Sequence, residues 1–143
     1  MKLRFAFAVN HNDQFEKKHF GDADKYIIYE LQNDILEYVS EETNLFKALD
    51  EEAEHGSKKK GKAIIGLLKD KGVNVLVSMQ FGTNIKLINE YFIPVNISLT
   101  NPKEVMAVLD KHLHWIADEW ERKSSDYKLF TIKSGILKSS IKK

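Results

Sequence analysis

The 143-residue chain contains no cysteine, only two prolines and only seven glycines. Without cysteine, the chain itself can form no disulfide, no thiolate zinc site and no cysteine-ligated iron–sulfur cluster, and it offers no cysteine nucleophile. Any metal that this chain binds must therefore be held by His, Asp, Glu, Met or backbone groups.

The chain also lacks a long apolar run and an excess of charge of one sign. No stretch reaches the length of a transmembrane helix, and the first residues, "MKLRFAFAVNHNDQ", have no signal-peptide pattern. We therefore expect a cytoplasmic protein with no membrane partner. Lysine and arginine number 22 against 21 acids, a net charge of +1, which gives no reason to expect binding to nucleic acid.

What the chain does contain is an alternation of apolar runs typical of a soluble globular domain. Hydrophobic residues make up 43% of the chain and charged residues 30%. The apolar runs and turn residues predict five strands, at residues 3–9, 25–31, 35–40, 73–79 and 94–99. Helical spacing and capping residues predict three helices, at residues 57–72, 83–91 and 101–122. We expect the acidic residues 41–54 to form mainly a loop, and residues 129–132 could add a further strand.

This order of elements predicts an α/β fold. Alternating strands and helices after residue 57 require parallel strands with right-handed crossovers, and the leading hairpin adds an antiparallel member. We therefore predict a mixed, mostly parallel five-stranded sheet flanked by helices. The α/β domain is expected at residues 1–122, followed by a C-terminal extension at residues 123–143.

Several loops of this predicted fold meet at one edge of the sheet. Ligands of open α/β sheets bind at the carboxyl ends of the parallel strands, and the antiparallel second strand begins at that same end. Three of the five histidines fall on loops at this edge. Candidate ligands there are the metal-binding His11, His19 and His55, with Asn10, Gly21, Gln80 and Gly82 as cofactor-binding neighbours. We expect His112 to pack in the core and His114 to be exposed.

A run of three lysines adds positive charge beside this edge. Lys58, Lys59 and Lys60 stand at the start of a predicted helix, where free backbone N–H groups can hold an anion. A solvated run of charges is the simpler interpretation of these lysines. In the same way, Gly21 and Gly82 can serve only as turn residues. Imidazoles bind borderline metals well, so histidines with lysines beside them suit an anionic metal complex better than a bare cation.

The sequence resembles the dinitrogenase iron–molybdenum cofactor-binding family, the NifX-like proteins. The stretches that carry the resemblance are "KLRFAFAV", "HFGDADKYIIYEL", "HGSKKKGKAIIGLLKDKGVNVLVSMQFG" and "INEYFIPVNI". They cover roughly residues 1 to 100. By position, His19 matches the family's histidine before Phe-Gly, and His55 matches the histidine before the glycine-containing helix start. Gly21 and Gly82 match its turn glycines.

The resemblance implies a ribonuclease-H-like fold and a non-catalytic carrier of an iron–sulfur or iron–molybdenum cluster, or of its precursor. Its partners would be cluster donor and acceptor proteins, and the protein would be a monomer or homodimer. A nuclease is disfavoured because two-metal chemistry needs carboxylates on the central strands, and the first strand offers none. Two alternatives stay open: a metal-independent interaction or regulatory module, and an anion binder that uses only the lysines.

Overall fold

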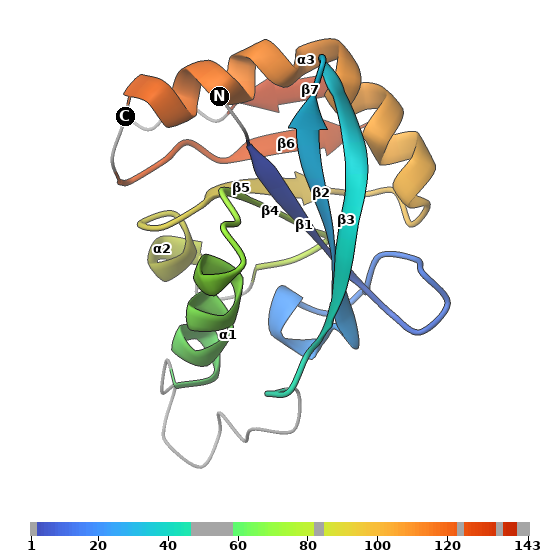
Figure 1. Ribbon diagram of the computed structural model, residues 1–143, viewed down its shortest axis with the longest axis vertical. Coiled ribbons are helices and arrows are strands. Elements are labelled where there is room, and N and C mark those ends of the chain that lie inside the picture. The colour runs from blue at the N-terminus through green and yellow to red at the C-terminus, as the bar shows by residue number, and fades with distance from the viewer. Residues whose placement is uncertain (1–2, 47–58, 82–84, 123–124, 134–135, 140–143) are drawn as a thin grey trace.

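The computed structural model describes residues 3–46, 59–81, 85–122, 125–133 and 136–139 (Figure 1). The elements in chain order are β1 (Arg4–Val9), the 3-10 turn η1 (Phe20–Asp22), β2 (Lys25–Gln32), β3 (Ile35–Thr43), α1 (Lys59–Asp70), β4 (Val75–Ser78), α2 (Ile85–Ile88), β5 (Ile93–Ile97), α3 (Pro102–Arg122), β6 (Phe130–Lys133) and β7 (Ile136–Ser139). In these ranges no helix is long and apolar enough to cross a bilayer.

The strands form one mixed sheet in the order β3-β2-β1-β4-β5-β6-β7. The four strands β1, β4, β5 and β6 are parallel to one another, whereas β2 pairs antiparallel with β1, β3 with β2, and β7 with β6. The mixed α/β sheet is confirmed, but the expected five strands are wrong, because the described residues form a sheet of seven strands. The further strand considered at residues 129–132 is found as β6. β6 and β7 come from the predicted C-terminal extension, and β6 pairs with β5, with Val95 opposite Phe130.

Turn and capping residues fix the ends of several elements as predicted. Asn33 and Asp34 have φ values of 51° and 67°, the pair of positive angles that a tight hairpin turn between β2 and β3 requires. Gly72, with a φ of 73°, ends the α1 segment. The side-chain oxygen of Asn101 accepts the N–H of Lys103 at 2.9 Å and so caps α3.

The hairpin is longer than expected. β3 runs to Thr43, so Glu41 and Glu42 lie in a strand, although we expected the acidic loop to begin at Glu41. Pairing with β2 overrides the low strand propensity of these acids, because Glu41 lies opposite Ile27 and also accepts a hydrogen bond from Lys25 Nζ at 3.1 Å.

Helix α3 lies on one side of the sheet and α1 and α2 lie on the other (Figure 1). Each face of the sheet carries its own hydrophobic core. On one face, α3 packs Val105, Leu109 and Ile116 against side chains from β1, β4 and β5. On the other face, α1 and α2 cover Ala6, Ala8, Tyr26, Ile28 and Leu76. Small alanines on this face of β1 leave room for the helices, while phenylalanines fill the α3 face.

The two histidines of α3 behave differently. His114 is exposed, as expected. His112 is only half-buried, and its ring stacks on Trp115 with 4.5 Å between centroids. His112 also has a non-helical φ of −131°, which marks a kink within α3.

Candidate functional site

The loop that carries His19 lies against the end of β4, as the predicted topology requires. His19 precedes η1 in an extended conformation, and its Nδ1 accepts the N–H of Gly21 at 3.2 Å. The next residue, Phe20, donates its N–H to the carbonyl of Gln80 at 2.9 Å. Phe20 is buried, and the hydroxyl of Tyr26 donates to its carbonyl at 2.8 Å. The histidine is therefore mounted on a turn that is anchored to two strands.

Asp22 links this turn to helix α1. One carboxylate oxygen accepts a hydrogen bond from Lys60 Nζ at 2.9 Å, and the other lies 3.4 Å from His19 Nε2. Burial alone would raise the pKa of Asp22. The hydrogen bond from Lys60 and the positive charges of His19, Lys60 and Lys18 outweigh burial, so the pKa of Asp22 lies below its ordinary value.

These contacts define the protonation pattern of His19. Because Nδ1 accepts the N–H of Gly21, a proton on the ring belongs on Nε2, which faces Asp22. A metal bound at Nε2 would replace this proton, and a metal at Nδ1 would displace the bond from Gly21. The side chain of His19 is 30% exposed, so a ligand can reach the ring.

Glycine is needed at position 21 because two side chains pass close to its Cα, and not because of an unusual backbone angle. A Cβ at this position would lie 3.2 Å from the His19 ring and 3.3 Å from Cε of Lys60. Its N–H is bound by His19, and its carbonyl accepts a hydrogen bond from Asn44 Nδ2 at 2.9 Å. Both backbone polar groups of Gly21 are therefore used in hydrogen bonds that hold the turn in place.

Sequence reasoning missed Asn44. The side chain is buried, and Nδ2 donates both to Gly21 and to the carbonyl of Ala23, at 2.9 and 2.8 Å. Its Oδ1 accepts the N–H of Phe46 at 3.0 Å. Asn44 thus ties the end of β3 to the turn. The available signal was an asparagine directly after a strand, where such residues commonly bind backbone groups.

The lysine run does not act as one cluster of free charges. Lys60 is only 4% exposed, and its ammonium is paired with Asp22. Lys59 is the first residue of α1, and Lys58 lies outside the described residues. Positive charge near His19 comes instead from Lys17 and Lys18, which precede it directly and are exposed.

Asn10 and His11 lie in the loop after β1. The side-chain oxygen of Asn10 accepts the N–H groups of Asn12 and Gln14, at 2.8 and 3.2 Å, and so shapes this loop. The side chain of His11 is 86% exposed, and its Nε2 lies 3.5 Å from Asp24. His11 and His19 therefore face different carboxylates.

Gln80 joins β4 to the His19 loop. Its side-chain nitrogen donates to the carbonyl of Lys17 at 3.1 Å, and its own carbonyl accepts from Phe20. His55 and Gly82 lie outside the described residues. Within the described ranges, no three His, Asp or Glu side chains are grouped to hold a metal ion.

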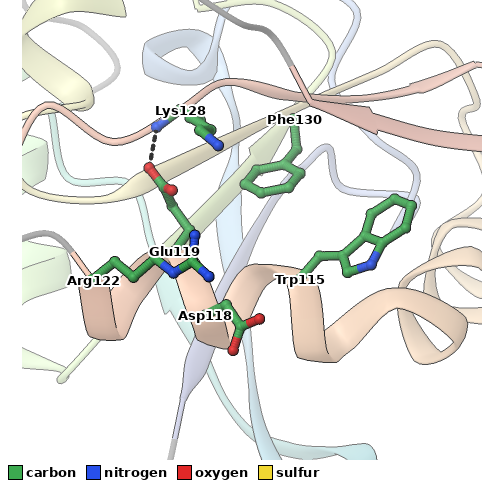
Figure 2. A pocket seen from close by; sticks show the side chains of 6 residues that line it. All are labelled: Trp115, Asp118, Glu119, Arg122, Lys128 and Phe130. Carbon is green, nitrogen blue, oxygen red and sulfur yellow. Dashed lines mark hydrogen bonds between the residues drawn. The ribbon is translucent and has the colours of Figure 1, made fainter.

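Two hollows lie away from His19. Figure 2 shows the smaller one, of about 160 Å³, between the second half of α3 and β6. Trp115 and Phe130 form its aromatic walls. Glu119, which is only 4% exposed, accepts the N–H of Lys128 at 2.7 Å and ties α3 to the start of β6. The larger hollow lies between β2, β3 and the start of α3. The sequence alone indicated neither of them.

A mixed sheet with helices on both faces and parallel central strands makes this an α/β protein, and the His19 turn lies at the end of one of these strands, β4. The family model "Dinitrogenase iron-molybdenum cofactor" matches residues 1–111, so the chain belongs to this family and the resemblance is confirmed. No curated protein matches the chain. The match ends within α3, so β6 and β7 lie beyond it.

Proposed function

We propose that this protein is a non-catalytic carrier of an anionic metal cluster, of the iron–molybdenum or iron–sulfur type, or of its precursor. The family supports a cofactor-related binding role. The observation that carries the proposal is His19, a partly exposed imidazole fixed by Gly21 and Asp22 at the ends of the parallel strands. In a chain without cysteine, imidazole is the most suitable ligand for such a metal.

His19 would act with other residues of the same edge. We propose His55, and also His11, as further ligands, with Asn10, Gly21, Gln80 and Gly82 forming the surrounding loops. The cluster would pass between donor and acceptor proteins. The ribonuclease-H-like classification, the monomeric or dimeric state, the cytoplasmic location and the domain boundary at residue 122 stay predictions.

The charges around His19 are compatible with an anionic ligand once Lys60 is considered. An anion near the ring meets the Asp22 carboxylate, but the ammonium of Lys60 lies 2.9 Å from that carboxylate and offsets its charge. Lys17 and Lys18 remain as exposed cations beside the ring. We therefore assign the attraction of the anion to these two lysines, with Lys58 and Lys59 as further contributors.

The test is anaerobic reconstitution with iron–sulfur and iron–molybdenum species, followed by elemental analysis and an absorption spectrum. His19→Asn is the sharpest variant, because asparagine can still cap the turn but has no imidazole. We expect it to lose most of the bound iron, and His19→Asn with His55→Ala to lose the remainder. His114→Ala, which removes an exposed histidine of α3, is the matched control and should bind as the wild type does.

Equal iron retention in the wild type and the double variant, with both folded by circular dichroism, would show that the histidines do not hold the cluster. That result would favour the second candidate, a metal-independent interaction module. The observation behind this candidate is the edge strand β3 and the residues after it, where Tyr38 and Leu45 are 61% and 73% exposed. It predicts partner capture that survives removal of the histidines.

A further inference from the structure

A hollow of about 300 Å³ lies on the face of the sheet that α3 covers. It is enclosed by residues from the loop after β1, from β2 and β3, and from the first turn of α3; those used below are Asp13, Ile27, Tyr29, Tyr38, Glu41 and Lys103. The volume is at the lower end of the range for small-molecule pockets. The hollow runs from the loop after β1 and the first turn of α3, at Asp13 and Lys103, along β2 to Tyr29, which lies opposite Phe5 near the start of β1.

Two tyrosine rings form a corner of this pocket. The centroids of Tyr29 and Tyr38 are 6.3 Å apart, and the ring planes meet at 80°. Tyr29 is packed from behind by Phe7, with 4.8 Å between centroids, so its orientation is fixed by the core. Tyr38 is 61% exposed. Faces of aromatic rings attract cations, and two rings at a steep angle can contact one cationic group together.

Two carboxylates lie beside the rings. Asp13 and Glu41 share the ammonium of Lys25, at 2.5 and 3.1 Å, and Lys103 also lines the pocket, so the charges balance and the rings carry the preference for a cation. Burial and the negative charges of Asp13 and Glu41 raise the pKa of Tyr29, which keeps the phenol neutral.

The start of α3 does not offer an anion site in compensation. The N–H groups of Lys103 and Glu104 donate to Asn101, at 2.9 and 3.1 Å, and Pro102 has no N–H. The first turn is thus capped from within, and the groups that would bind a phosphate or carboxylate are already used. Lys103 is exposed and lines the pocket, so its ammonium repels a cationic ligand. Removing this charge therefore tests whether the ligand is positively charged.

We propose that this pocket binds a small organic cation, an ammonium with an apolar body. The ammonium lies against the rings of Tyr29 and Tyr38 beside Glu41 and Asp13, and the apolar body lies on Ile27. This pocket is separate from the proposed cluster site, because Phe20, next to His19, and helix α1, which carries Lys60, pack on the opposite face of the sheet.

Three probes of nearly equal shape and different charge test the proposal. Choline is cationic, 3,3-dimethylbutanol is neutral and 3,3-dimethylbutyrate is anionic. In NMR titrations of the full chain, we expect choline to bind roughly 5- to 30-fold more tightly than the alcohol, the range for a cation on aromatic rings. The carboxylate should bind most weakly. n-Butylammonium serves as a second cation with a smaller head group.

Binding of the alcohol or the carboxylate as tightly as choline would overturn the proposal. Saturable binding of neither ammonium would overturn it equally.

Variants identify the groups responsible. Tyr38→Leu removes an exposed ring and should bring the affinities for choline and the alcohol close together. Glu41→Gln should weaken choline several-fold and leave the alcohol unchanged, whereas Lys103→Gln should tighten choline binding. Tyr91→Leu removes another exposed tyrosine, which lies beside Lys69 outside this pocket, and is the control. A choline preference unchanged in Tyr38→Leu, or weaker choline binding in Lys103→Gln, would contradict the assignment.

Discussion

Replacing Asn44 by alanine tests whether the turn that carries His19 is held in place by β3. The Nδ2 group of Asn44 donates to the carbonyls of Gly21 and Ala23, at 2.9 and 2.8 Å, and all three residues are buried. Asn44→Ala would leave both carbonyls without this donor and would also remove the acceptor for the N–H of Phe46. We therefore expect Asn44→Ala to destabilise the whole turn that carries His19.

The magnitude follows from the number of bonds that are lost. A buried polar group left without its partner costs about 1–3 kcal/mol, and two carbonyls on one short turn relax together. We therefore expect Asn44→Ala to lower the free energy of unfolding by roughly 2–4 kcal/mol. In a chain of this size each kcal/mol shifts Tm by about 2–4 °C, so Tm should fall by roughly 5–15 °C.

The assay is urea unfolding followed by circular dichroism, together with amide hydrogen exchange of Gly21 and Asp22. Exchange at these amides should accelerate in Asn44→Ala even under conditions where the protein stays folded. Asn12→Ala, which removes an exposed asparagine of the preceding loop, should stay within about 0.5 kcal/mol of the wild type. A loss below this limit in Asn44→Ala would refute the proposed role of these hydrogen bonds.

Two further predictions concern the same turn. Gly21→Ala places a Cβ 3.2 Å from the His19 ring and 3.3 Å from Lys60, so it should cost about 1–3 kcal/mol in urea unfolding and shift the His19 ring resonances in NMR; unchanged resonances would contradict the crowding. Asp22 has a lowered pKa in the folded protein, so it stabilises the fold above the unfolded pKa, near 3.8, and this contribution is lost as pH falls through the folded value. Asp22→Asn should therefore show a weaker loss of stability between pH 5 and 2, and it should bind an anionic cluster at least as well as the wild type; an unchanged acid profile would contradict the ion pair with Lys60.

Local signals predicted most of the elements, including the possible strand at residues 129–132 that is found as β6, whereas β7 was not expected. The Asn33-Asp34 turn, the Gly72 end of the α1 segment and the Asn101 cap of α3 each depend on neighbouring residues, and each is found. β6 and β7 have only four residues each and gain their stability from pairing with β5 and with each other. That pairing depends on where α3 returns the chain, which a local pattern cannot show.

The candidate site was predicted in part, because topology brings loops together but does not say which side chains pair. The expected meeting of the His19 loop with the end of β4 is found in the hydrogen bond from Phe20 to Gln80. The role of Lys60 was missed although the sequence contained a signal. Lys60, Ile64 and Leu68 follow one another at intervals of four, so Lys60 lies on the buried stripe of α1. A lysine at such a position requires an acidic partner, and Asp22 is that partner.

The two proposed sites share the connection between β1 and β2, which raises the question of whether they are coupled. Asp13 lines the tyrosine pocket and His19 follows six residues later, but Phe15 separates them. Phe15 is buried, forms a bridge with Val9, and donates its N–H to Thr100 at 2.8 Å. Residues 10–14 thus form a separate turn, whose two ends are joined by the bridge between Val9 and Phe15 next to the start of α3.

Along the chain, a movement of Asp13 reaches His19 only past this anchor. We therefore expect the two sites to act independently: His19→Asn should leave choline binding unchanged, and Tyr38→Leu should leave iron retention unchanged. Because coupling of binding energies is reciprocal, a change in one direction must appear in the other. Mutual effects of several-fold would show that the turn around Phe15 moves as one unit with the His19 loop, and amide exchange at Phe15 would then slow when either ligand is bound.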